Sequence, residues 1–168
     1  MKKIKLETIM DDCENPMKNW ADDLPNVLDL IRTNSARIVD DTSLERLLKC
    51  LSMIAVDNTQ RQTLLDSSTG ILNFLCPPFQ TIFVCPLAAN FALRLTGIIS
   101  GSSLEAFVAL EKSGTLEAMF STSLQNSEFL ELWKAARLQQ AFFLSLSCLV
   151  SNSAGYKWIK ERGNINQI

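Results

Sequence analysis

Cysteine is the residue type in this chain with the widest chemistry, because thiolates bind metals and act as nucleophiles. The chain has five cysteines and no histidine. The cysteines are scattered and never spaced as C-x-x-C: Cys13, Cys50, Cys76, Cys85 and Cys148. Without imidazole the common zinc sites lack a ligand, and a four-cysteine site would need ligands from distant helices. We therefore predict free buried thiols that pack as small hydrophobes, with no metal and no cofactor.

The carboxylates do not form a recognisable catalytic set either. The acidic pairs Asp11-Asp12, Asp22-Asp23 and Asp40-Asp41 lie at expected helix boundaries, where capping explains them. The chain has no imidazole base, no G-x-S-x-G motif and no glycine loop that would cradle a phosphate. We predict no catalytic residues and no enzyme activity. The alternative is a helical enzyme with an unrecognised lysine or cysteine nucleophile.

Length and charge restrict the remaining classes. With 168 residues and 47% hydrophobic content, the chain is expected to bury one continuous core. Its net charge of −2 favours neither phosphate backbones nor anionic lipid, so nucleic acid is disfavoured as a partner. The longest apolar run, Ala141 to Val150, is about half of a membrane span, which requires ~20 residues. The basic start, Met1 to Leu6, lacks the apolar core of a signal peptide, so we expect a cytoplasmic or nuclear protein.

The first half of the chain is expected to form helices. Asp23 is predicted to cap a helix that has Pro25 in its first turn. Thr42 and Glu45 form a capping box for the next helix, along which apolar residues recur at i, i+3, i+4 and i+7. Further segments are predicted to form an N-terminal amphipathic helix over 1–13, a short helix over 58–67 and an irregular turn over 79–84.

The second half repeats this organisation. A helix is predicted from Leu87 to Ser100, ending at Gly101, and Ser102 with Glu105 forms a second capping box. A long helix is predicted from Ser127 to Val150. The residues expected to be buried along this helix are Phe129, Leu132, Trp133, Ala136, Leu144, Leu146 and Leu149.

Four residues recur at a constant interval. Leu51, Ile54, Gly70 and Leu72 are matched by Leu95, Ile98, Gly114 and Leu116, each pair 44 residues apart. A period of ~40–47 residues is typical of helical solenoids, in which each unit buries its apolar face against its neighbours. Both glycines are predicted to turn the chain in the left-handed conformation.

These units resemble the armadillo repeat, in which a long third helix is followed by a short first helix and a glycine opens the second helix. A third unit runs from Leu146 to Gly163 with a slightly shorter interval. The resemblance covers residues 42–168 and implies an all-α, armadillo-like α-solenoid of about three repeats, preceded by N-terminal helices over 1–41. HEAT repeats and irregular helical bundles can mimic parts of the pattern.

Armadillo proteins that bind basic peptides carry an asparagine and tryptophan ladder on the third helix. The matching positions hold Met53, Gly97 and Cys148 instead of asparagine, and Lys49, Leu93 and Leu144 instead of tryptophan, so the resemblance does not imply a nuclear-import adaptor. The polar residues expected on that face are Arg46, Lys49, Asn90, Arg94, Arg137 and Ser145. They form either a solvated surface or a site for an acidic partner segment.

Tyr156 and Trp158 lie in the last short helix among basic residues, a mixture found at interfaces. They either close the core of the terminal unit or bind a helical partner. The chain stops where another helix would begin, after Gly163. We therefore expect it to continue into further repeats of a longer parent protein.

The function expected from the resemblance is that of a non-catalytic scaffold that binds another protein. In its general sequence pattern, the segment from Trp133 to Gly163 resembles long centriolar armadillo proteins of the rotatin kind. This resemblance implies a role in centriole or centrosome assembly. A meiotic or DNA-repair armadillo adaptor is the rival interpretation.

Overall fold

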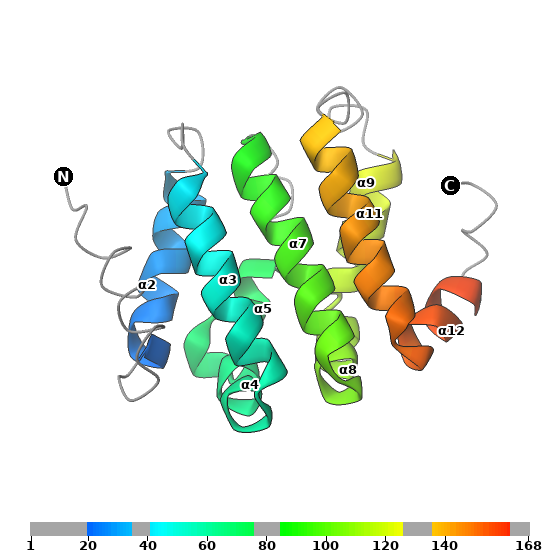
Figure 1. Ribbon diagram of the computed structural model, residues 1–168, viewed down its shortest axis with the longest axis horizontal. Coiled ribbons are helices and arrows are strands. Elements are labelled where there is room, and N and C mark those ends of the chain that lie inside the picture. The colour runs from blue at the N-terminus through cyan, green and yellow to red at the C-terminus, as the bar shows by residue number, and fades with distance from the viewer. Residues whose placement is uncertain (1–19, 35–40, 76–84, 126–135, 162–168) are drawn as a thin grey trace.

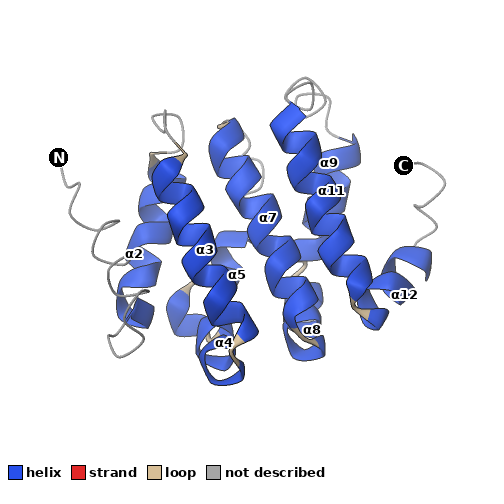
Figure 2. Ribbon diagram, in the orientation of Figure 1, coloured by secondary structure: helices blue, strands red, loops and turns tan. Residues whose placement is uncertain are grey.

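The computed structural model describes residues 20–34, 41–75, 85–125 and 136–161. Every regular element in these segments is a helix, which confirms the predicted all-α class (Figure 2). The elements are α2 (Trp20–Thr33), α3 (Thr42–Val56), α4 (Asn58–Leu65), η2 (Ser67–Thr69), α5 (Ile71–Leu75), α7 (Pro86–Ser102), α8 (Leu104–Lys112), α9 (Thr115–Gln125), α11 (Ala136–Ser151) and α12 (Ser153–Glu161). The segments predicted over 1–13, 79–84 and 127–135 lie outside the described residues.

The three long helices α3, α7 and α11 lie side by side in one row (Figure 1). Each is followed by a shorter helix at its C-terminal end, namely α4, α8 and α12, and the shorter helices α5 and α9 lie behind the row. Helix α2 packs against η2 and α5. One continuous core of buried residues runs through the described chain from α2 to α12. That these units are armadillo repeats stays a prediction.

The glycine turns occur where the sequence predicts them. Gly70 has a φ of +68° and Gly114 a φ of +77°, a conformation that costs glycine nothing and other residues about 1–2 kcal/mol. Gly70 leads from η2 into α5, and Gly114 leads from α8 into α9. Each glycine turn therefore comes after a long helix and a shorter helix, which are α3 and α4 for Gly70 and α7 and α8 for Gly114.

Several predicted helix ends are wrong. Helix α2 begins at Trp20 rather than after Asp23, because the buried Trp20 extends the apolar stripe by one turn. Helix α3 has Asp41 as its N-cap residue instead of the predicted Thr42–Glu45 capping box. Helix α7 continues through Gly101 to Ser102, so the cap of α8 is Ser103, whose hydroxyl oxygen accepts a hydrogen bond from the Ala106 backbone N–H at 3.1 Å.

Burial also corrects one predicted core position. Leu144 is 46% exposed, whereas Leu149 is fully buried and Leu146 is partly buried. The reason is geometric: Leu144 follows Arg137 by seven residues and precedes Cys148 by four, so it shares the open side of α11 with them. Among the cysteines, Cys50 and Cys85 are buried free thiols as predicted, and Cys148 is only partly buried.

Candidate partner-binding face

The side of the row formed by α3, α7 and α11, here called the long-helix face, carries most of the residues selected from the sequence. Helix α7 lies in the middle and contacts both neighbours. The two contacts differ in closeness.

Helices α7 and α11 approach each other backbone to backbone. A Cβ atom at Gly97 would lie 2.5 Å from the Cα atom of Ser145, so only glycine fits there. A Cβ atom at Gly101 would lie 2.8 Å from the Cys148 carbonyl oxygen. The hydroxyl of Ser145 donates to the carbonyl oxygen of Leu93 on α7 or to that of Ala141 on its own helix. Small residues thus bring the two helices together.

Ser145 therefore does not lie on the exposed face where the sequence pattern placed it. It is buried, because α11 turns this side chain directly onto the glycine of α7. Its hydroxyl holds two helices together and has no room for a partner. Asn152 adds a longer contact of the same kind, from its side-chain amide to the Ser100 carbonyl oxygen at 3.5 Å.

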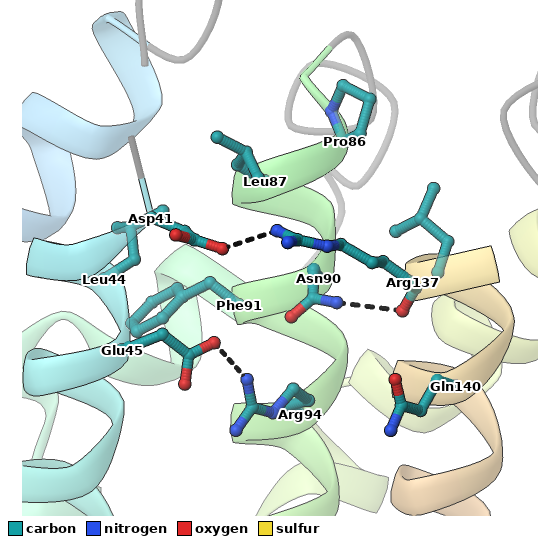
Figure 3. Close-up of a pocket in the computed structure, with 11 residues that line it drawn as sticks. Asp41, Leu44, Glu45, Pro86, Leu87, Asn90, Phe91, Arg94, Arg137 and Gln140 are labelled. Carbon is teal, nitrogen blue, oxygen red and sulfur yellow. Dashed lines mark hydrogen bonds and ion pairs between the residues drawn. The ribbon is translucent and has the colours of Figure 1, made fainter. Parts of the chain in front are cut away.

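Helices α3 and α7 both contribute buried residues to the core, and on the exposed face they are joined by an ion pair. Arg94 on α7 pairs with Glu45 on α3 (Figure 3). The Arg94 side chain is 29% exposed and that of Glu45 is 47% exposed. Exposed pairs of this kind contribute only ~0–1 kcal/mol to folding. This ion pair therefore contributes little to holding α3 against α7.

A second ion pair spans the whole row. Arg137, at the start of α11, reaches across α7 to the Asp41 carboxylate at the start of α3, with an N–O distance of 2.7 Å (Figure 3). The Asn90 side-chain amide on α7 donates to the Arg137 carbonyl oxygen at 2.9 Å. The side chain of Asp41 makes no capping hydrogen bond to α3, so its carboxylate faces the arginine instead.

These ion pairs surround an open hollow of about 420 Å³, here called the charged hollow. Its floor and rim are formed by Asp41, Leu44, Glu45, Pro86, Leu87, Asn90, Phe91, Arg94, Arg137, Leu138 and Gln140. The described residues that line it include two carboxylates and two guanidinium groups, so their formal charges balance. An acidic partner would have to displace an existing pair to use Arg94 or Arg137.

Arg46 and Lys49 are different, because both side chains are exposed and neither forms an ion pair with another described residue. They lie on α3, where Lys49 follows Glu45 by one turn. The surplus positive charge of the face is therefore concentrated on α3. It is available to a partner without breaking a contact of the fold.

A second hollow, which the sequence analysis did not predict, lies toward the C-terminal ends of the three long helices. This apolar trough has an open volume of about 640 Å³. It is lined by Ser52, Met53, Val56, Ile98, Gly101, Ser102, Cys148 and Ser151. The signal was present, since Met53 and Cys148 occupy ladder positions where an armadillo peptide receptor would have asparagine. Partial burial raises the pKa of the Cys148 thiol above its ordinary value, so burial favours the uncharged form of this side chain.

The two aromatic candidates of the last helix lie in different surroundings. Trp158 is buried, and its ring centroid lies 5.3 Å from that of Phe120 on α9, so it packs in the core. Tyr156 is 52% exposed on α12. Partner contact at Tyr156 stays a prediction, separate from the long-helix face.

The described residues show no other obvious chemistry. No group of three or more cysteine, aspartate and glutamate side chains gathers there in a way that could hold a metal ion. Within the same segments, no helix combines the length and the apolar character needed to cross a membrane.

Comparison with protein-family models identifies a family. A family model described as the Integrator complex assembly factor BRAT1 matches residues 17–168. Neither a curated protein nor a solved structure matches the chain. The match does not support the resemblance to centriolar proteins of the rotatin kind, because it identifies a different family.

Proposed function

This chain belongs to the family of the Integrator complex assembly factor BRAT1, and we propose that it is a non-catalytic helical scaffold that holds another protein while an Integrator complex is assembled. The family description supports the assembly role. The armadillo-like arrangement and the position of the binding surface are the finer parts of the proposal. Such a role places the protein in the nucleus or the cytoplasm.

The binding surface we propose is the long-helix face, and the observation that carries this choice is the exposed charge of Arg46 and Lys49, which form no ion pair with another described residue. Both residues lie on α3, which also contributes residues to the charged hollow and to the apolar trough. Charge-assisted contacts with carboxylates are stronger than neutral hydrogen bonds. An acidic segment of the partner therefore fits this face better than a basic one.

The test is binding of separately produced Integrator subunits to the immobilised chain. We expect at least one subunit to bind and the affinity to fall as salt is raised, because screening weakens exposed charge contacts. The double variant Arg46→Glu, Lys49→Glu should lose that subunit. Its folding should be unchanged, because exposed charges contribute little to stability.

The matched control reverses two exposed lysines elsewhere, Lys112 on α8 and Lys160 on α12, and so changes the net charge by the same amount. It should keep the subunit. Equal loss with both double variants would mean that net charge alone steers binding. Binding that survives the Arg46 and Lys49 reversal would move the site away from this face.

A further inference from the structure

We propose that the apolar trough binds a large apolar side chain of the partner segment, while a carboxylate of the same segment binds Lys49 one helical turn away. This inference rests on the proposed function, since it names the chemistry of the partner at that face. It adds an apolar anchor that the charged residues alone do not suggest. It also predicts the direction in which the segment lies.

The first argument is the uncovered apolar surface of the trough. Met53 is 50% exposed and Val56 is 73% exposed, and none of the described residues that line the trough is charged. Ligand pockets commonly have volumes of ~300–1,000 Å³, and the trough falls within this range. Covering the two side chains and Ile98 removes apolar area from water, which is favourable at ~25 cal/mol per Å² before ordering costs.

The second argument is the behaviour of the three serines at the rim. Each donates its hydroxyl hydrogen to the carbonyl oxygen three residues earlier on its own helix: Ser52 to Lys49 at 2.6 Å, Ser102 to Ile99 at 2.8 Å and Ser151 to Cys148 at 2.6 Å. A hydroxyl has only one hydrogen to donate. The rim is therefore poorer in free donors than its composition suggests, and it favours an apolar occupant.

The third argument is the order of residues along α3. Arg46, Lys49, Met53 and Val56 follow at intervals of three or four, so two cations and two apolar side chains form one stripe. Four residues of helix rise by ~6 Å between Lys49 and Met53. An apolar residue and an acidic residue can span this distance when they are three or four apart in a helix, or two apart in an extended segment.

The direction follows from the charge at the two ends of the stripe. Asp57 lies just beyond Val56, and its carboxylate accepts hydrogen bonds from the backbone N–H groups of Thr59 and Gln60. The C-terminal carbonyls of α3 add partial negative charge at the same end. A partner carboxylate is therefore repelled near Val56 and attracted near Lys49, so the acidic residue lies toward the start of α3.

The experiment is selection of random twelve-residue peptides displayed on phage, with the whole chain as bait. We expect the enriched peptides to share a large apolar residue with Asp or Glu two to four positions away. Met53→Glu and Val56→Glu should each lower their binding by about tenfold or more, the loss of a hot-spot contact. Lys49→Glu should select against acidic peptides. Leu104→Glu, at an apolar residue exposed on α8 outside the trough, is the matched control and should have no effect.

Alkylation of Cys148 locates the bound peptide. A selected peptide should slow its reaction with iodoacetamide, as followed by peptide mapping, because Cys148 lines the trough. The inference is overturned if no common motif is enriched, if the motif lacks a carboxylate, or if neither Val56→Glu nor Cys148 protection shows an effect.

Failure of this inference can be told from failure of the proposed function. If an Integrator subunit binds through Arg46 and Lys49 but ignores Met53→Glu and Val56→Glu, the proposed function stands and the anchor is wrong. If the acidic and apolar motif is selected while no Integrator subunit binds, the anchor stands and the proposed function is wrong.

Discussion

The two contacts of α7 in the row differ in what holds them. Toward α11, glycine lies against the backbone of Ser145, and a buried hydroxyl connects the helices. Toward α3, where both helices also contribute to the core, the polar connection is the ion pair Arg94–Glu45 between exposed side chains, beside a hollow lined by all three long helices. Backbone approach leaves a contact no room to change, whereas a bridge of long side chains can be remade. The close contact fixes α11 against α7, while the two exposed cations that form no ion pair with another described residue, Arg46 and Lys49, lie on α3.

The largest expected effect comes from filling the close contact. Gly97→Val should destabilise the protein by about 3 kcal/mol, because its Cβ would overlap the Ser145 backbone and overpacking costs ~1–3 kcal/mol or more. Gly97→Ala should also destabilise, although alanine normally favours a helix over glycine by ~1 kcal/mol. Urea denaturation measures both. Ser147→Val, exposed on α11, is the control and should be near neutral. Neutral Gly97 variants would show that the two helices separate easily.

A smaller effect is expected from removing the hydroxyl at the same contact. Ser145→Ala should lower the free energy of unfolding by about 1 kcal/mol, the usual contribution of a buried hydrogen bond. Ser52→Ala is the matched control, because its hydroxyl also bonds a helix carbonyl but lies at the surface of α3. If both variants lose the same stability, the bond between helices has no special role.

The two exposed ion pairs made by Glu45 and Asp41 should contribute less still. A double-mutant cycle of Arg94→Gln and Glu45→Gln should give a coupling energy of ~0.2–1 kcal/mol, falling with added salt. The cycle of Arg137→Gln and Asp41→Gln should give a value no larger, since the Arg137 side chain is 73% exposed. A coupling above that of the Ser145 hydroxyl would reverse the distinction between the two contacts.

Cys148 is expected to affect folding least. The prediction for this residue concerns how its alkylation rate depends on pH. Its pKa is raised, so the thiolate fraction near neutral pH is lower than that of an ordinary cysteine. Alkylation should therefore be slow at pH 7 and should keep accelerating as pH rises to the raised pKa. Mass-spectrometric mapping distinguishes Cys148 from the other cysteines, and Cys148→Ser removes the signal. If the alkylation rate of Cys148 stops rising at the pH at which an ordinary free thiol is fully ionised, the trough is fully hydrated.

Local sequence pattern was sufficient for the helical class, the glycine turns and most of the buried stripe. Apolar residues that recur three and four positions apart indicate which side of a helix is apolar. A glycine between two such segments indicates a left-handed turn. Both are properties of a few neighbouring residues. The prediction of Gly70 and Gly114 therefore needed no knowledge of how the helices pack.

The tertiary structure decided how the polar residues are used. The sequence predicts that Asp41 and Glu45 cap the helix that became α3. In the structure, their carboxylates form ion pairs with Arg137 and Arg94 from distant parts of the chain. The sequence predicts Ser145 at the surface, but the residue is buried. It lies against Gly97, a glycine 48 positions earlier in the chain, which lets the two helices approach closely. The apolar trough likewise needs three helices to exist. Periodicity describes each helix alone, whereas the distance between two helices depends on residues of both, so only the packed structure could show these features.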